Sequence, residues 1–180
     1  MFSKSLTKLI DEAIVPAVLI ICAKLVGLFA ANYIFVTDWK VVPGSVLGFL
    51  PKISYLNYQA YYLANTYSNA IMLIVVTLGV SIVVVKAHFF HSSHISPKLA
   101  GILSRLRLSS LVSDTYGLYH QSAIWVLFLY LICSFLIVQS IFKASSPLLA
   151  IIGFVIAVNA TWVLIFDIES EIKIWGKEHK

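Results

Sequence analysis

The sequence predicts an all-α, polytopic membrane protein whose four transmembrane helices form an antiparallel bundle. Of its 180 residues, 60% are hydrophobic and only 12% are charged, with a mean hydropathy of +0.93, whereas soluble domains carry about 25% charged residues. The apolar residues gather into four stretches near the length of about 20 residues that a helix needs to cross a bilayer. None alternates like a barrel strand, so each is expected to be a helix. The spans are predicted at residues 13–36, 69–85, 122–142 and 148–166.

Composition also excludes several classes of protein. The net charge of +5 reflects a shortage of acidic residues, eight against thirteen basic ones, and not a dense basic surface, so no nucleic-acid partner is expected. The apolar content is too high for a disordered chain. The sequence therefore predicts a single transmembrane domain over residues 1–180, with membrane lipid as a partner.

Basic residues outside the spans predict the orientation of the helices. Four crossings place the N-terminal tail, the loop at 86–121 and the tail at 167–180 on one side of the membrane. That side carries nine basic residues and the other side three, and the positive-inside rule then places both termini in the cytoplasm, across an inner or plasma membrane. The nine are Lys4, Lys8, Lys86, Lys98, Arg105, Arg107, Lys173, Lys177 and Lys180, and the three are Lys40, Lys52 and Lys143.

The first span contains a charged residue near its middle. A lysine at the bilayer centre costs at least about 2.5 kcal/mol, so Lys24 is expected to face protein or a water-filled cavity. It lies on the same side of the helix as Ala23, Gly27 and Ala31, small residues that let a second helix approach closely. A cleaved signal peptide is the alternative, but this apolar run exceeds the about 7 to 15 residues of a signal and contains Lys24.

The polar neighbours of Lys24 decide what this residue does. No Asp or Glu lies inside a predicted span, so the expected neighbours are Asn159 in the fourth span, Thr77 and Ser81 in the second, and Ser134 in the third. Three roles stay open for the lysine. It lines a pore or cavity, it extends toward the membrane surface, or it meets an acidic residue of another protein.

The outer loop at 37–68 starts with turn residues, Pro43-Gly44 and Pro51, and then becomes rich in tyrosine. No helix breaker follows Ile53, which predicts a helix that either lies on the membrane surface or extends the second span. Tyrosine is typical of the headgroup layer, and a ligand or partner site built from the rings is the alternative.

The inner loop at 86–121 contains a predicted cytoplasmic amphipathic helix. Ser96 and Pro97 form an N-cap followed by a proline at the first helical position. Apolar residues fall within one arc of a helical wheel and basic residues flank that arc. The apolar residues are Leu99, Ile102, Leu103 and Leu106, and the basic ones are Lys98, Arg105 and Arg107. The helix is expected either to lie on anionic lipid or to bind a cytoplasmic protein partner.

The third and fourth spans are joined by a very short turn. Ser146 and Pro147 repeat the N-cap signal directly after it, so the two spans are expected to form a tight antiparallel hairpin. Residues 167–180 keep helical spacing and are expected to continue the fourth helix into the cytoplasm.

The fourth span also presents two different packing faces. Its small residues Gly153, Ala157 and Thr161 lie on one face and Asn159 on another. Both faces favour contact with other helices. Together with Lys24, they favour self-association of the chain.

Histidines gather at the cytoplasmic end of the second span. His88, His91 and His94 recur at every third residue, and His120 precedes the third span. If the two helices are adjacent, His88, His91 and His120 can share a transition metal, hold a haem or titrate as a pH sensor. Histidines are also common at membrane interfaces. The sequence thus predicts no cofactor, with a haem or metal site as the alternative.

No motif of a known catalytic site occurs in the chain. HExxH, GxSxG, P-loop, GxGxxG and CxxC motifs are absent, and the spans lack a carboxylate for acid-base catalysis. We therefore expect a non-enzymatic membrane subunit, a homo-oligomeric sensor or scaffold that binds a cytoplasmic partner through its basic inner loop and C-terminal tail. The alternatives are a small oligomeric channel with Lys24 in its lining and a redox protein that binds haem or metal through the histidines.

Overall fold

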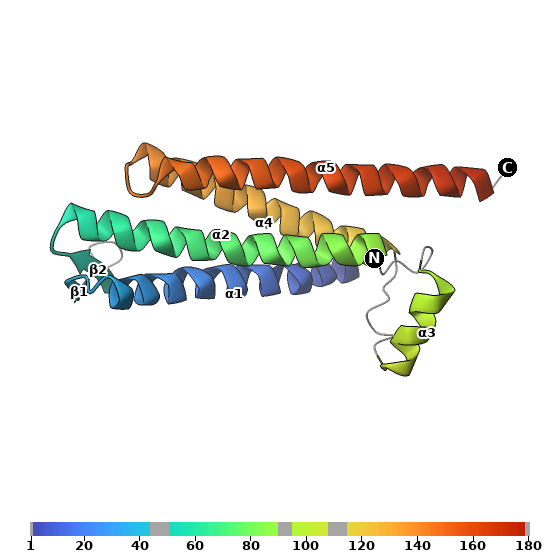
Figure 1. Cartoon of the computed structure of the whole chain (residues 1–180), viewed down its shortest axis with the longest axis horizontal. Helices are drawn as coiled ribbons and strands as arrows, with labels where there is room; N and C mark the ends of the chain where they lie inside the picture. Colours follow the sequence, from blue (N-terminus) through green and yellow to red (C-terminus); the bar gives the residue numbers. More distant parts are fainter. Residues whose placement is uncertain (1, 44–50, 90–94, 108–114, 179–180) are drawn as a thin grey trace.

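The structure is a computed structural model that describes residues 2–43, 51–89, 95–107 and 115–178. Over these residues it contains five α-helices and one two-stranded sheet (Figure 1). The helices are α1 (Phe2–Ile34), α2 (Tyr58–Phe89), α3 (Pro97–Arg105), α4 (Thr115–Ile141) and α5 (Pro147–Glu178), and the strands are β1 (Trp39–Pro43) and β2 (Pro51–Tyr55). Four of the helices are long and apolar enough to cross a membrane, as the prediction of four helical spans requires.

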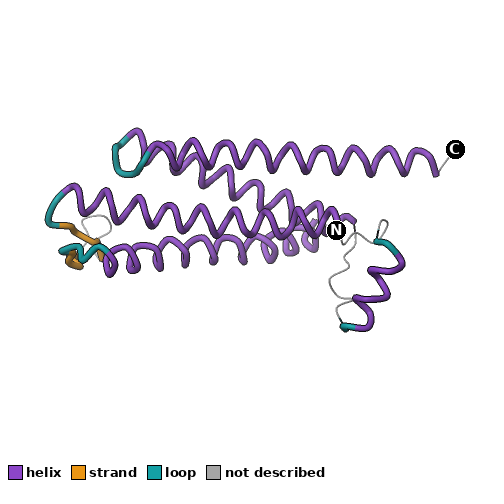
Figure 2. The backbone as a smooth tube through the Cα atoms, viewed as in Figure 1, coloured by secondary structure: helices purple, strands orange, loops and turns teal. Residues whose placement is uncertain are grey.

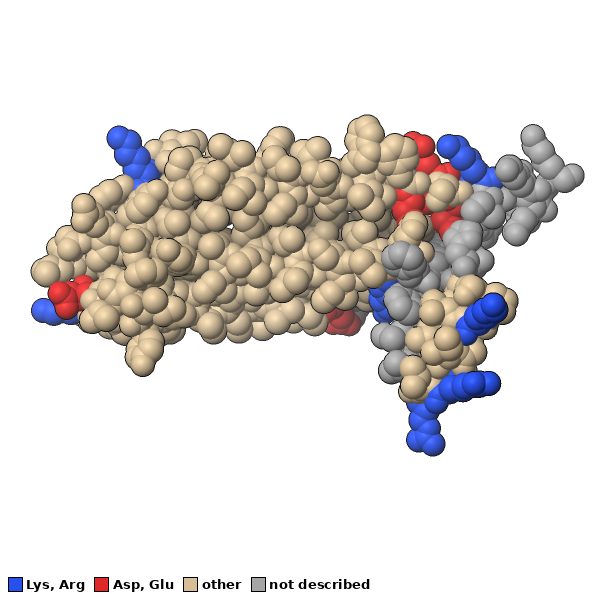
Figure 3. Space-filling model, viewed as in Figure 1, with Lys and Arg blue, Asp and Glu red and all other residues tan. Residues whose placement is uncertain are grey.

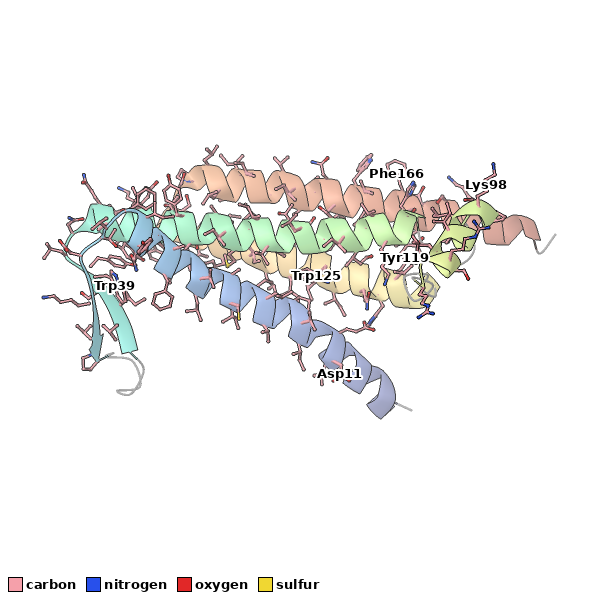
Figure 4. All side chains as sticks on the ribbon, turned by 60° about the horizontal axis from the view of Figure 1, so that its bottom comes forward. Asp11, Trp39, Lys98, Tyr119, Trp125 and Phe166 are labelled. Atoms are coloured by element: carbon pink, nitrogen blue, oxygen red, sulfur yellow. The ribbon has the colours of Figure 1, made fainter. Side chains whose placement is uncertain are left out.

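The four long helices lie side by side, and α2 is central because it packs against α1, α4 and α5 (Figure 2). Both chain ends lie at the same end of the bundle, which we call the terminus end. The opposite end carries β1 and β2, and we call it the hairpin end. Figure 4 shows that α1 diverges from α2 toward the terminus end, where Asp11 is labelled.

Charged side chains gather at these two ends. Between them, the face seen in Figure 3 is free of Lys, Arg, Asp and Glu along the middle of the bundle. Most large apolar residues of the four helices are exposed there, as in a protein whose solvent is lipid. The long axis of the bundle therefore fits a direction across the bilayer.

Two predicted boundaries differ at the hairpin end. Residues from Ile53 onward were expected to be helical, but Ile53 lies in β2 and pairs with Val41 of β1. The helix starts only at Tyr58, because Asn57 Oδ1 accepts a hydrogen bond from Ala60 N over 2.7 Å and so caps it. The tyrosine-rich segment thus extends the second span, which was one of the two expected arrangements.

Other boundaries follow the local signals. In α3, Ser96 Oγ accepts from Leu99 N over 3.3 Å, so the predicted N-cap is confirmed. α5 begins at Pro147 and runs without a break to Glu178, so the predicted continuation of the fourth helix is confirmed over the described residues. α4 begins at Thr115, earlier than the predicted span.

Small residues set how closely the helices pack. In α1, Ala23, Gly27 and Ala31 are all buried, and a Cβ added at Gly27 would lie only 2.8 Å from Ser68 Cα of α2. In α5, Gly153 is buried, and an added Cβ would lie 3.2 Å from Cys133 Sγ of α4. Both series of small residues therefore pack against helices of the same chain.

Candidate functional site

A partly buried polar cluster joins α1, α2 and α4, and we call it the Lys24 cluster (Lys24, Asn65, Asn69 and Gln139). Lys24 lies two residues from the middle of the span Ile10–Ile34. Its Nζ donates a hydrogen bond to Asn65 Oδ1 over 2.7 Å and a second one to Asn69 Oδ1. Asn65 Nδ2 in turn donates to Gln139 Oε1 over 2.8 Å. The lysine thus meets its hydrogen-bond acceptors inside its own chain.

The close approach of α1 and α2 places these groups together. Ser68 Oγ donates to the carbonyl oxygen of Lys24 over 2.6 Å, directly beside the Gly27 contact. Asn65 and Asn69 are one helical turn apart and so lie on the same face of α2. Two amide oxygens therefore point at one ammonium group.

The same cluster reaches the turn between α4 and α5. Asn65 Nδ2 also donates to Ala144 O over 2.7 Å, and Ser146 N donates to Thr66 Oγ1 over 3.2 Å. Tyr58 OH donates to Lys143 O. The hairpin end of α2 thus holds the α4–α5 turn, and Lys24 is the deepest member of a hydrogen-bond network that extends to that turn.

The Lys24 cluster is suited to hold the positive charge of Lys24 itself. Besides the two amide oxygens, the ring of Phe135 lies with its centroid 5.8 Å from Nζ, and the face of an aromatic ring attracts cations. The other members are neutral amides, which are not nucleophiles or general bases in ordinary enzyme chemistry. The arrangement can hold a buried charge and fix three helices.

The prediction of which polar residues contact Lys24 is wrong. Asn159 is exposed, and its Nδ2 donates to Val155 O of its own helix over 2.8 Å. Ser134 Oγ likewise donates to Tyr130 O over 2.9 Å. Asn65 was missed because it precedes the predicted second span at 69–85, and Asn69, the first residue of that span, was not considered as a partner. The spacing of Asn65, Ser68 and Asn69 is the signal that was available.

Three of the predicted intramembrane polar residues do come together, but away from Lys24. Thr77 and Ser81 of α2 and Asn159 of α5 line one groove between these helices, with a volume of about 380 Å³. The remaining lining side chains are valine, isoleucine and alanine. We call this surface the α2/α5 groove.

A second polar cluster, the terminus-end cluster, joins all four long helices (Glu12, His88, Tyr119, His120 and Asp167). His88 Nδ1 lies 3.2 Å from Asp167 Oδ1, and Tyr119 OH donates to Asp167 Oδ2 over 3.0 Å. His120 Nδ1 lies 2.5 Å from Glu12 Oε2. Tyr119 is labelled at this end of the bundle in Figure 4. Two carboxylate–histidine pairs therefore connect α1 with α4 and α2 with α5.

These pairs bear on the predicted convergence of histidines. His88 and His120 contact carboxylates on different helices, and His91 and His94 lie outside the described residues. Among the residues that the structure describes, no three His, Cys, Asp or Glu side chains form a group that could hold a metal ion. The observed geometry is one of separate histidine–carboxylate contacts.

Asp167→Leu is expected to lower the free energy of unfolding by about 1–3 kcal/mol, because His88 and Tyr119 both lose their carboxylate. Glu169→Leu is the matched control, two residues along α5. Glu169 is exposed and pairs with Lys173 at 3.9 Å, so its loss should cost under about 1 kcal/mol. Reversible unfolding in mixed micelles with increasing dodecyl sulfate measures both, and equal losses would contradict a stabilising role for the cluster.

The amphipathic helix α3 presents its basic residues to the outside. Lys98, Arg105 and Arg107 are exposed, as are the apolar Ile102 and Leu106, at 53% and 61%. In Figure 1 the helix lies beside the terminus end and runs across the long axis of the bundle. Figure 3 shows the basic side chains projecting from it.

Aromatic side chains form a layer at the hairpin end. The ring centroids of Tyr55 and Tyr61 lie 5.9 Å apart, and those of Tyr58 and Tyr61 lie 6.4 Å apart. These three tyrosines line a hollow of about 400 Å³ beside β2. The layer has the composition of an interfacial belt, and the hollow keeps the alternative of a ligand site open.

Comparisons with known proteins add no relative. No protein-family model, no curated protein and no solved structure matches the chain.

Proposed function

We propose that this chain is a non-enzymatic membrane scaffold, with both termini and α3 in the cytoplasm. It binds anionic phospholipid and a cytoplasmic protein partner at the inner face of the membrane. One observation carries the proposal: α3 and the two residues after it run across the bundle axis and expose two apolar and three basic side chains. These are Ile102, Leu106, Lys98, Arg105 and Arg107. If the bundle axis crosses the bilayer, such a helix lies along the membrane surface. The excess of basic residues on the terminus end supports its placement in the cytoplasm.

Anionic phospholipid is the ligand that best fits α3. Ile102 and Leu106 suit the boundary between headgroups and acyl chains, and Lys98, Arg105 and Arg107 suit the phosphates. Each basic residue near an anionic surface contributes about 1 kcal/mol. A soluble acidic protein would use the basic residues but would need an apolar groove for Ile102 and Leu106.

The far end of α5 offers a second surface for a cytoplasmic protein partner. α5 has 32 residues and is therefore about 48 Å long, against a hydrocarbon core of about 30 Å. Its last turns project past the bundle (Figure 1). Ile172, near the C-terminal end of this helix, is 66% exposed and lies beside the Glu169–Lys173 pair, so this end of α5 offers both an apolar and a charged surface.

A channel lined by Lys24 is the competing function. A pore lining needs the ammonium to face an open path, whereas Nζ of Lys24 donates to Asn65 and Asn69 beside the ring of Phe135. These contacts favour a structural role for the lysine and hence favour the scaffold. The proposal also includes a role as a pH sensor, because the terminus-end cluster contains two histidine–carboxylate pairs.

Hydrogen exchange in nanodiscs tests the binding of α3 to lipid. Amides of 98–105 are expected to exchange several-fold more slowly when phosphatidylcholine is partly replaced by phosphatidylglycerol, because the helix is then held on the surface. The triple variant Lys98→Glu/Arg105→Glu/Arg107→Glu should lose this response. Lys40→Glu/Lys143→Glu, at the hairpin end, is the matched control and should keep it.

The end of α5 serves as an internal reference in the same measurement. Its amides should exchange at the same rate in neutral and anionic nanodiscs, because its last turns point away from the bundle. Equal exchange of α3 in both lipids would overturn the lipid assignment. Protection of α3 that needs an added acidic protein, in neutral lipid as well, would favour the soluble partner instead.

A further inference from the structure

The α2/α5 groove contains polar groups that face lipid at mid-depth. Asn159 lies twelve residues after Pro147, the first residue of α5, and thus about 18 Å from the hairpin end of that helix. That depth is near the centre of a hydrocarbon core about 30 Å thick. Ser81 is also exposed, and Thr77 Oγ1 is buried without a hydrogen-bond partner among the described residues.

Asn159 is only partly satisfied by its own helix. One N–H of its amide donates to Val155 O, and the structure gives no other hydrogen bond for this side chain over the described residues. A carboxamide has two donors and an acceptor with two lone pairs. At least one donor and the carbonyl oxygen therefore face the groove, where acyl chains have no group to pair with them.

Lys24 and the small residues of the spans, by contrast, have their partners inside the chain. Lys24 is bound by Asn65 and Asn69, and the small residues of α1 and α5 pack on neighbouring helices. Asn159 thus differs from them in pointing away from its own bundle. The groove beside it is shallow and lined mostly by valine, isoleucine and alanine, a surface against which a further transmembrane helix can pack.

We propose that a second copy of this chain fills the α2/α5 groove, with Asn159 of each copy paired to Asn159 of the other. Copies in one membrane share one orientation, so their two-fold axis runs along the membrane normal. Any residue near that axis then meets its own equivalent at the same depth. A carboxamide is complementary to itself, because each one donates through nitrogen and accepts through oxygen.

Ser81 of α2 offers a further polar contact. It lines the groove that α5 of the second copy would enter, and its side chain is exposed, whereas Thr77 Oγ1 is buried. A different membrane protein would need a polar side chain at the depth of Asn159 to satisfy its amide equally well. The inference goes beyond the proposed function, because neither membrane anchoring nor lipid binding by α3 requires a second copy.

Dimerisation of the full-length protein in liposomes tests the proposal. Energy transfer between labelled copies is measured over a range of protein-to-lipid ratios for the wild type and Asn159→Leu. The substitution is expected to weaken dimerisation about tenfold or more, by removing a reciprocal pair of hydrogen bonds. Ser134→Ala is the matched control, since Ser134 is exposed on α4 and its hydroxyl donates to its own helix.

Cross-linking provides a second measurement that does not depend on affinity. In a variant with Cys22→Ser and Cys133→Ala, Asn159→Cys should form a disulfide-linked dimer under mild oxidation, and Leu131→Cys, exposed on α4, should not. Each variant is checked for wild-type helicity first. The triple charge variant of α3 should dimerise like the wild type, which separates this inference from the proposed function.

Several outcomes would overturn the proposal. A monomer at every protein-to-lipid ratio excludes the second copy, and so does a dimer whose affinity Asn159→Leu leaves unchanged. Equal cross-linking through residues 159 and 131 would mean random collision. Capture of a different membrane protein at residue 159 by a wild type that stays monomeric would assign the groove to that protein.

Discussion

Gly27→Ala is expected to lower the free energy of unfolding by about 3 kcal/mol, at the upper end of the cost of overpacking. The added Cβ would lie 2.8 Å from Ser68 Cα and 3.1 Å from Ser68 O. Both are backbone atoms of a helix, so no side chain can rotate away and α1 has to separate from α2. The separation also stretches the hydrogen bond from Ser68 Oγ to Lys24 O.

The matched control for this change is Gly117→Ala in α4. A Cβ added there meets no atom within 4 Å, so the same chemical change should cause no loss of stability and, because alanine favours helices, even a small gain. Unfolding in mixed micelles measures both variants on one scale. If Gly27→Ala unfolds at the same detergent fraction as Gly117→Ala, the close contact of α1 and α2 does not hold the bundle together.

Local signals explain why much of the fold was predictable. The number of spans follows from hydropathy alone, and the starts of α3 and α5 follow from Ser96-Pro97 and Ser146-Pro147, where a cap acts over three or four residues. The start of α2 was mistaken because tyrosine and asparagine lower the hydropathy of residues 58–68 without breaking a helix. β2 was missed because its hydrogen bonds are made to a separate segment, β1, and not within its own residues.

The candidate site depends on which helices are neighbours, and the sequence contains no direct record of that. Lys24 was expected to need shelter, and it has shelter, but from Asn65 and Asn69 and not from Asn159. Two partners on a neighbouring helix can be assigned only when the depths and faces of both helices are known together. The polar spacing in α2 was visible within a segment expected to be helical, but its asparagines were not connected with Lys24.

This outcome changes the argument for self-association. Lys24 and both series of small residues had suggested a larger assembly, but all of them are used within one chain. The exposed amide of Asn159 still calls for a partner outside the bundle. The proposed dimer therefore rests on an uncharged amide in lipid and not on a buried charge.

The Lys24 cluster allows the order of stability in a series of variants to be predicted. Asn65→Leu/Asn69→Leu removes both acceptors and leaves the ammonium without partners in an apolar environment. Breaking a buried charged contact from one side costs about 3–5 kcal/mol. Lys24→Met alone should cost less, about 1–2 kcal/mol, because the remaining amides of Asn65 and Gln139 still pair with each other.

The decisive comparison combines the two changes. Adding Lys24→Met to Asn65→Leu/Asn69→Leu should restore about 2 kcal/mol, since an apolar cluster of similar volume has no unpaired charge. Lys40→Met, at an exposed lysine of β1, is the control and should restore nothing in the same background. Restoration specific to Lys24 would show that the amides exist to hold its charge. If Lys24→Met instead deepens the loss, the lysine contributes through other contacts, and a role in a pore or an interface would regain support.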